Sequence, residues 1–479
     1  MEHGAKVMVT CIALVAASML LPELGWLGPL VDRSDLEVLS RPFQSVDPAV
    51  NAMDGLSLAS LSEGKFTAMV HEVTPKSVST TESTSKITPG GVEGQSRKTM
   101  PKTVRSPFHG HALERLYRGL FRIEKGRGPP VHVVQLGDSE IASDAVTMTI
   151  RSLFAARFSD GGPGFVLAMR PWPSYSRTGI THDDPDGFSV RSYPRKQARN
   201  KRYGPGGVGF DATEGKGASI ALRTSLVGQP CRIRFLYLQQ PKSREFRLVA
   251  NGKTYLSGTS EGPFKSAGVS HDFERCPKRL GFRTRGYSRF RAFGWQIHAR
   301  NGGVSWSSLG VNGARFSHLT HYADGALPET LKSLSPDAIV FSFGLNVTAH
   351  AIGPNKRYPG RVATVLSMIR RALPTVPCMV LGPYAVATKI KDKWTLSPTV
   401  EKVIHAQRRA ADASGCVFVD RFEELGGAPV LDGWRRKTPR ILSGDNVHLT
   451  REGARRMGHF VFNRLTQTFD RLRPKKQAE

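Results

Sequence analysis

Short apolar runs alternate with helical patterns in two separated parts of the chain, and this alternation limits the fold most. The runs are VHVVQL, VSWSSL, DAIVFSF, VPCMVLGP and CVFVD, at residues 131–136, 304–309, 337–343, 376–383 and 416–420. Helical patterns follow them over about 141–158, up to about 334, and over 359–372, 399–413 and 450–469. Such units are typical of a parallel sheet that helices cover on both faces. The sequence therefore predicts an α/β domain with five parallel strands.

Three of these runs end in a turn that contains glycine and polar residues. The turns occupy residues 137–139, 310–313 and 344–346. In open parallel sheets, ligands gather beyond the carboxyl ends of the strands. We therefore expect a functional site that is built from these three turns.

Between residues 184 and 302 the pattern changes to short alternating runs. They are ASIALRTS, RIRFLYLQQ, EFRLVANGKTYLSG and a stretch that ends in GWQIHA. Alternation with period two, separated by Gly, Pro and Asn-Gly turns, indicates half-buried antiparallel strands. We predict an antiparallel β-sandwich that is inserted into the α/β domain. The glycine-rich segment 204–209 fits turns better than a phosphate loop, because no Lys-Ser/Thr pair follows it.

The charge of the chain is strongly positive and concentrated in the insertion. The chain has 479 residues and a formal net charge of +28, and residues 185–300 contain 23 Lys and Arg against 7 Asp and Glu. This composition favours polyanionic partners, for which Arg is well suited. The charge alone does not choose among nucleic acid, anionic lipid and acidic glycan. If the insertion holds an anionic polymer, Arg283, Arg285, Arg289 and Arg291 are its candidate contacts. A solvated basic face is the alternative. No nucleic-acid-binding motif is present, so we expect no nucleic acid.

The N-terminus carries an export or anchoring pattern. Residues 7–22 form a run of 16 residues without charge, and LGWLGPLV continues the apolar stretch to Val31. A spanning helix needs about 20 apolar residues, so the stretch fits either a signal peptide or an uncleaved membrane anchor. We expect a periplasmic or extracellular protein, with N-terminal membrane contact if the segment stays. A buried N-terminal helix is the alternative.

These patterns divide the chain into consecutive segments. Residues 74–107 are rich in Ser, Thr, Lys, Pro and Gly and offer too little apolar surface for a core. The predicted segments are a signal peptide or anchor at 1–31, a low-complexity linker at 32–107, the α/β domain at 108–183 and 303–470, the inserted sandwich at 184–302, and a basic tail at 471–479.

The cysteines allow disulfides but show no metal-binding motif. Of five Cys residues, Cys378 and Cys416 open two strands that we expect to be adjacent and parallel. Export would allow a disulfide between them, and two buried thiols are the alternative. The same choice applies to Cys231 and Cys276, for which the strand register is not predicted. No CxxC or HExxH motif occurs, so we predict no metal and no cofactor.

Several residues at the predicted strand ends could carry acyl-transfer chemistry. Ser139 stands at a strand-to-helix turn, where its own amide could donate to an oxyanion. His448 follows Asp445 by three residues, and a carboxylate at that spacing can orient an imidazole. Asn346 follows the third run and could donate to a developing negative charge. Taken singly, each has an ordinary explanation: a helix cap, a surface histidine and a turn residue.

Together and in this order, GDS, a glycine turn, GxN and DxxH resemble the SGNH/GDSL hydrolase family. Further matching text is GDSEIASD, FSDGGPGFVLAMRPW, LGVNGA, FGLN, LGP and DNVHLTREG. The sequence is most similar to the branch with an inserted, carbohydrate-binding-like β-sandwich, which includes bacterial peptidoglycan O-acetylesterases. The resemblance covers about residues 125–470 and implies a flavodoxin-like, three-layer α/β/α domain.

The resemblance also implies roles for individual residues. Ser139 would be the nucleophile, His448 the general base and Asp445 its orienting carboxylate. The oxyanion would be held by the Ser139 and Gly313 amides and the Asn346 side chain, with Gly310 in reserve. Two positions depart from the pattern: Val347 replaces a frequent acidic residue, and Glu140 a frequent His. We expect both to line the cleft.

The resemblance implies a serine esterase that removes O-acetyl groups from an envelope or extracellular, peptidoglycan-like polysaccharide through an acyl-enzyme. Two alternatives remain. A polysaccharide O-acetyltransferase would use the same Ser-His-Asp site. A non-catalytic, basic glycan-binding envelope protein would use none of this chemistry.

Overall fold

The computed structural model describes residues 110–473, except 196, 213–214, 243–244, 286–289 and 350–355. The predicted signal peptide or anchor at 1–31 and the linker at 32–107 lie outside the described residues. So does most of the basic tail. In the described part of the chain, no helix is both long and apolar enough to cross a membrane.

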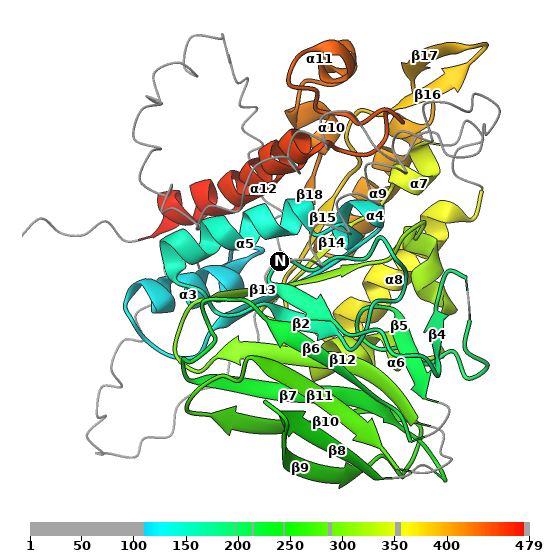
Figure 1. The fold of residues 1–479 in the computed structure, drawn as a ribbon. Coiled ribbons are helices and arrows are strands. Elements are labelled where there is room, and N and C mark those ends of the chain that lie inside the picture. The colour runs from blue at the N-terminus through cyan, green and yellow to red at the C-terminus, as the bar shows by residue number, and fades with distance from the viewer. Residues whose placement is uncertain are drawn as a thin grey trace, which may run out of the picture. The chain divides into compact units, whose positions relative to one another are not determined.

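A five-stranded parallel sheet forms the centre of the α/β domain, as predicted (Figure 1). Its strands, in spatial order, are β13 (Val304–Gly310), β1 (Val131–Gly137), β14 (Ala338–Ser342), β15 (Cys378–Leu381) and β18 (Val417–Val419). Every strand pair in this sheet is parallel. All seven residues of β1 are buried, which explains why this strand is a continuous apolar run.

Helices cover both faces of this sheet and complete three layers. Val131 and Val133 of β1 pack on one face, and Val134 and Leu136 on the other. The first face carries α3 (Glu114–Glu124), α5 (Ala145–Phe158) and α12 (Arg451–Leu472), and the second carries α6 (Ala326–Ser333), α8 (Tyr358–Ala372) and α9 (Val400–Ala413) (Figure 1). Thr450 caps α12 by accepting a hydrogen bond from Gly453 N, as predicted.

The inserted segment forms two antiparallel sheets that pack face to face. One sheet has the order β10 (Lys265–Phe273), β7 (Cys231–Gln239), β12 (Phe290–Ala299), β5 (Val208–Ala212), β4 (Phe188–Ser192). The other has the order β3 (Ile180–His182), β6 (Gly217–Leu222), β11 (Arg279–Thr284), β8 (Glu245–Ala250), β9 (Lys253–Thr259). Phe235 of the first sheet packs against Phe282 of the second, with ring centroids 5.2 Å apart.

The sandwich starts earlier than the predicted boundary at residue 184. Strand β3 begins at Ile180, and β2 (Gly164–Leu167) pairs antiparallel with β12. The amide of Phe165 in β2 also donates to Ser307 Oγ of the parallel sheet, at 2.7 Å. One hydrophobic core runs from the sandwich into the second face of the parallel sheet. The α/β domain and the insertion therefore share a core.

Two predicted helices are interrupted, and several short elements were not predicted. The helix after β1 is split into α4 (Ser139–Ala142) and α5, with Asp144 between them in a left-handed conformation at φ 62°. The stretch before residue 334 is split into a 3-10 helix, η2 (Phe316–His321), and α6. The additional elements are α7 (Leu345–Thr348), β16 (Ala387–Ile390), β17 (Lys393–Leu396), α10 (Arg421–Glu424) and α11 (Val430–Arg436).

Two disulfides close loops in the two parts of the fold. Cys378 and Cys416 are bonded, with Cα atoms 4.7 Å apart, at the starts of the adjacent strands β15 and β18. Cys231 and Cys276 are bonded within the sandwich, with Cα atoms 5.3 Å apart. The alternative of buried thiols does not hold for either pair.

Candidate active site

Three polar side chains meet beyond the carboxyl end of β1. Ser139 Oγ lies 2.8 Å from His448 Nε2, and His448 Nδ1 lies 2.5 Å from Asp445 Oδ2. Ser139 is the first residue of α4, and Asp445 and His448 lie in the loop before α12. Gly137 makes the sharp turn possible, because a Cβ there would lie 2.3 Å from Ile141 Cγ1 and 2.8 Å from the Ser342 carbonyl.

The Asp445 carboxylate is fixed by donors from its own loop. Its Oδ1 accepts hydrogen bonds from Ser443 Oγ at 2.6 Å and from the Val447 and His448 amides at 3.0 and 2.9 Å. Burial alone would raise the pKa of Asp445, but the bonds from His448, Ser443 and the two amides hold that pKa well below its usual range. Asp445 therefore stays ionised and aims at His448 Nδ1.

The imidazole of His448 is poised to accept a proton. The hydrogen bond to Asp445 raises the pKa of His448, against the opposing effect of burial, and the carboxyl groups of Asp138 and Glu140 add to the rise. The His448 side chain is 48% exposed, so water and a substrate can reach its Nε2. A histidine held in this way can take a proton from a hydroxyl and return it to a leaving group.

The turns after β13 and β14 come together, as expected for turns at the carboxyl ends of parallel strands. Asn346 Nδ2 donates to the Ala314 carbonyl at 3.0 Å, which joins the turn that holds Gly313 to α7. Gly313 has φ +73° and lies in the turn itself. Gly310 belongs to β13 and pairs with Gly137, and a Cβ there would lie 2.0 Å from the Ala142 amide nitrogen. Gly310 is therefore required by close packing against α4.

A cleft of about 360 Å³ opens at the Ser139 hydroxyl. Its walls come from α4, the start of α5, the loop with Ser174, the turn with Asn312 and the loop before α12. Asn312 Nδ2 donates to Ser174 Oγ at 3.0 Å, so the two opposed loops are linked. In the described residues, no group of three or more His, Cys, Asp or Glu side chains is arranged to hold a metal ion.

Comparison with known proteins bears on the family and the fold. The sequence model of the GDSL-like lipase/acylhydrolase family matches residues 272–456. A solved structure of a peptidoglycan O-acetylesterase superposes with a TM-score of 0.64 and 17% identity, over 76% of this chain and 96% of that chain. The sequence match over 272–456 and the shared fold both support an SGNH, or GDSL-like, hydrolase. The chain is an ester hydrolase of the SGNH type.

Other similar structures cover about a third of this chain. An acetyl xylan esterase aligns with a TM-score of 0.28 and 19% identity, over 34% of this chain and 81% of that chain. A catalytic mutant of an acetylxylan esterase from Geobacillus stearothermophilus aligns with a TM-score of 0.26 and 18% identity, over 34% and 72%. No curated protein sequence matches the chain.

The family match begins at residue 272, within β10 of the sandwich, and so does not reach Ser139. Residues 272–456 contain Gly313, Asn346, Asp445 and His448. In the folded chain, Ser139 lies near these residues because β1, which precedes it, pairs with both β13 and β14.

The two departures from the family pattern are both buried. Val347 is 4% exposed and belongs to the hydrophobic core, so the expectation that it lines the cleft is wrong. Glu140 contributes to the cleft wall, but its carboxylate is turned inward to Arg421 Nη1 at 2.7 Å. Both side chains of this pair are at most 2% exposed.

The Glu140–Arg421 pair connects the nucleophile turn to the histidine loop. Arg421 Nε donates to the Gly382 carbonyl at 2.6 Å, and the Arg421 guanidinium lies 5.2 Å from the centroid of the Tyr384 ring. Tyr384 Oη donates to the carbonyl of Val447, next to His448, at 3.0 Å. Glu140, which stands where relatives of this branch often have His, thus forms an ion pair with a buried arginine.

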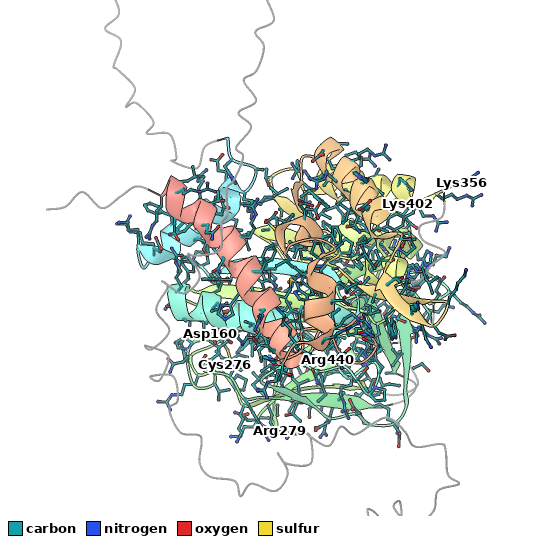
Figure 2. All side chains as sticks on the ribbon, turned by 90° about the horizontal axis from the view of Figure 1, so that it is seen from above. Asp160, Cys276, Arg279, Lys356, Lys402 and Arg440 are labelled. Carbon is teal, nitrogen blue, oxygen red and sulfur yellow. A yellow bond between two sulfur atoms is a disulfide. The ribbon has the colours of Figure 1, made fainter. Side chains whose placement is uncertain are left out.

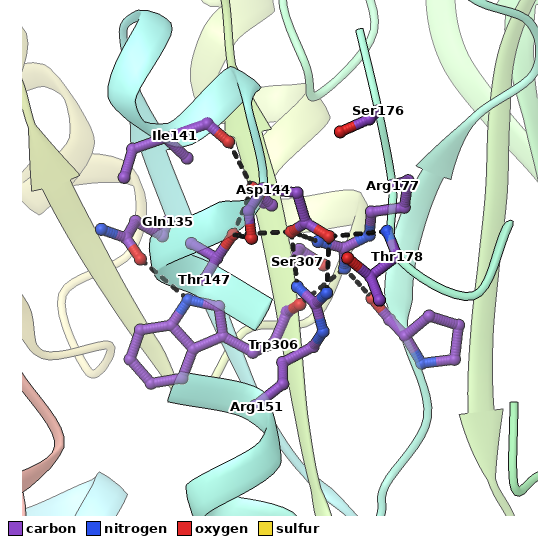
Figure 3. A network of polar contacts seen from close by, with 12 residues as sticks. Gln135, Ile141, Asp144, Thr147, Arg151, Ser176, Arg177, Thr178, Trp306 and Ser307 are labelled. Atoms are coloured by element: carbon purple, nitrogen blue, oxygen red, sulfur yellow. Dashed lines mark hydrogen bonds and ion pairs between the residues drawn. The ribbon is translucent and has the colours of Figure 1, made fainter. Parts of the chain in front are cut away.

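A second buried network lies behind α4 and shapes the cleft wall. Arg151 and Arg177 converge on the Asp144 carboxylate at 2.7 to 2.8 Å, and the Thr178 amide donates to it at 2.8 Å (Figure 3). Burial would raise the pKa of Asp144, but the two guanidinium groups hold it well below its usual range. The network fixes the loop with Ser176, whose Oγ donates to the Ser143 carbonyl at 3.0 Å.

The basic side chains that we predicted as polymer contacts do not form one group. Figure 2 shows charged side chains on many elements, with Arg279, Lys356, Lys402 and Arg440 labelled at separate places. Arg283 and Arg285 lie exposed at the end of β11. Arg289 lies outside the described residues.

For Arg291 the prediction is wrong. Arg291 is only 7% exposed and lies directly opposite Asp211 in the β12–β5 pair. Its Nε and Nη2 donate to the two carboxylate oxygens of Asp211 at 2.5 and 3.0 Å, and its Nη1 donates to the Arg202 carbonyl at 2.8 Å. Arg291 therefore holds the sandwich together and is not available to a polymer.

Proposed function

We propose that this SGNH hydrolase is exported and removes O-acetyl groups from an envelope or extracellular, peptidoglycan-like polysaccharide, with Ser139, His448 and Asp445 as its catalytic residues. The observation that carries the proposal is the hydrogen-bonded chain from Ser139 Oγ through the His448 ring to Asp445, open to a cleft. The same chain of contacts in other serine hydrolases activates a hydroxyl as nucleophile.

In the first half of the reaction, Ser139 Oγ attacks the acetyl carbonyl carbon while His448 Nε2 takes the hydroxyl proton. The carbonyl oxygen becomes an oxyanion, to which the Ser139 and Gly313 amides and Asn346 Nδ2 can donate. Collapse of this intermediate breaks the ester bond, and His448 returns the proton to the sugar oxygen that leaves. The product is a free sugar hydroxyl and an acetylated Ser139.

In the second half, water replaces the sugar. His448 Nε2 takes a proton from the water as its oxygen attacks the acetyl-enzyme. Collapse releases acetate and returns the proton to Ser139. Asp445 stays ionised throughout and stabilises the imidazolium that forms in each half.

The polymer class is supported by the inserted sandwich and by the solved peptidoglycan O-acetylesterase, which matches this chain over both parts of the fold. Export is supported by the apolar stretch at 7–31 and by the two disulfides, since such bonds persist in oxidising compartments.

The test is acetate release from O-acetylated peptidoglycan, with acetylated xylan as the comparison polymer. We expect release from peptidoglycan, and a loss of turnover of about 10⁶-fold in Ser139→Ala and in His448→Ala. Asp445→Asn should retain more activity, with a loss of about 10⁴-fold. Acetate release from acetylated xylan but not from peptidoglycan would show that the substrate is a different polymer. Unchanged acetate release by Ser139→Ala would overturn the assignment of the nucleophile.

Adding a deacetylated oligosaccharide acceptor to the same assay separates hydrolysis from transfer. We expect acetate as the main product at every acceptor concentration. Acetylated acceptor in place of acetate would show an O-acetyltransferase instead.

A further inference from the structure

A second cavity, of about 700 Å³, opens at the amino ends of the parallel strands, whereas the active site lies at their carboxyl ends. Pro130, Asn301 and Ser335 line it, and these residues precede β1, β13 and β14, whereas Ser139 follows β1. The other wall is the six-stranded sheet of the sandwich, through β7, β10 and β12. This cavity shares no lining residue with the cleft at Ser139.

The lining of this cavity is strongly cationic. Five arginines and two aspartates contribute to it: Arg115, Arg122, Arg232, Arg234, Arg300, Asp272 and Asp337. Three of the arginines have acidic partners. Arg115 pairs with Asp337 at 3.2 Å, Arg232 with Asp272 at 2.6 Å, and Arg300 with Glu274.

The other two arginines, Arg122 and Arg234, have main-chain partners instead. Arg122 Nη2 donates to the Pro129 carbonyl at 2.9 Å, and Arg234 Nη1 donates to the Ser333 carbonyl at 2.5 Å. Among the described residues, no carboxylate forms an ion pair with either of them. Each guanidinium carries five N–H donors, so both retain donors for a ligand.

Both guanidinium groups are partly withdrawn from water. Burial lowers the pKa of Arg234, and the buried Nε of Arg122 has no hydrogen-bond partner in the described residues. An arginine stays charged in proteins, so partial burial without a counter-charge is unfavourable until an anion arrives. The fold therefore holds two partly buried cations without an ion-pair partner among the described residues.

The floor of the cavity adds no charge of its own at neutral pH. His132 and His298 lie there, with ring centroids 4.6 Å apart. Burial lowers the pKa of His132 to about 4 and that of His298 well below its usual value, so both rings are neutral. The positive potential of the cavity thus comes from arginines alone and persists across the physiological pH range.

We propose that this cavity is a binding site for the anionic group of an acidic glycan, either a phosphate or a carboxylate, held by Arg122 and Arg234. The planar guanidinium fork matches the paired oxygens of both groups. The volume suits one or two sugar units, since pockets for small ligands span about 300–1,000 Å³. Binding at this cavity does not require the esterase reaction at Ser139. The cavity would hold the polymer at a distance from Ser139.

The experiment is calorimetric titration of the full chain at low salt, with inorganic phosphate in one arm and trigalacturonate in the other. We expect binding in at least one arm, and the arm that binds identifies the anion. Arg122→Gln with Arg234→Gln should weaken binding about tenfold or more. Arg247→Gln, which changes an exposed arginine on the far sheet, is the matched control and should bind like the natural protein.

Turnover of a small aryl acetate should be the same in all these variants, because the cavity lies away from Ser139. If the double variant does not fold, each single variant is titrated instead, with its thermal unfolding as a check. The proposal is overturned if the natural protein binds neither anion, or if the Arg122 and Arg234 variants bind as well as the Arg247 control.

Discussion

The protonation state of one imidazole decides when the active site can work. His448 Nε2 must be unprotonated to accept the Ser139 proton, and its bond to Asp445 raises its pKa. Near Ser139 a second group is perturbed: burial, and then the nearby Glu140, raise the pKa of Asp138 to about 7. The site therefore combines an ionised Asp445, a basic His448 and a carboxyl that titrates near neutrality.

The pH profile of turnover follows from the raised pKa of His448. As the pH falls, His448 is protonated and loses its role as base, so a raised pKa makes activity decline at a higher pH than an ordinary histidine would. We predict that the acid limb of kcat/KM on an aryl acetate lies above pH 6.5. Asp445→Asn should shift this limb to lower pH, since its bond is the largest cause of the rise. An unshifted limb in that variant would show that another group titrates.

At the scale of elements, buried ion pairs position the segments that carry the catalytic side chains. Glu140 on α4 holds Arg421 on α10, which contacts the Gly382 carbonyl and the Tyr384 ring. Removing one partner of such a pair leaves a buried charge without compensation.

We predict that Glu140→Gln costs about 3–5 kcal/mol of unfolding free energy, measured by denaturant titration. The matched control is Glu424→Gln, which breaks a partly exposed pair with Arg464 and should cost about 0–1 kcal/mol. Turnover should also fall in Glu140→Gln, because Tyr384 holds the Val447 carbonyl beside His448. Equal costs in the two variants would contradict the role given to the buried pair.

The sequence predicted those elements whose signal is local. Four of the five parallel strands, all but β18, are buried throughout and so stand out as apolar runs. Thr450 caps its helix with its own hydroxyl. The network at Asp144, where the helix breaks, was not predictable, because one of its members is Arg177, 33 residues further along the chain. Likewise, strand alternation gave no sign that β12 would place Arg291 opposite Asp211. Partners that only strand pairing brings together stay hidden in a single sequence.

At the scale of the whole molecule, the sandwich and the α/β domain are one folding unit in the described part of the chain. Their core is continuous, and Val166 of β2 lies opposite Trp295 of β12. We predict that residues 184–302 produced alone lack a cooperative thermal transition, because β12 then loses β2. Residues 110–473 should melt cooperatively under the same conditions. A sharp, independent transition of the excised segment would show two separable domains.

The proposed reaction requires that Ser139 carries an acetyl group between its two halves. Rapid mixing with an aryl acetate, acid quenching, and mass spectrometry of the peptide that contains Ser139 detect this group. We predict one acetyl group on Ser139 in the natural protein and none at this position in Ser139→Ala. Full turnover without an acetyl group on Ser139, or with the acetyl group on another residue, would contradict the proposed reaction.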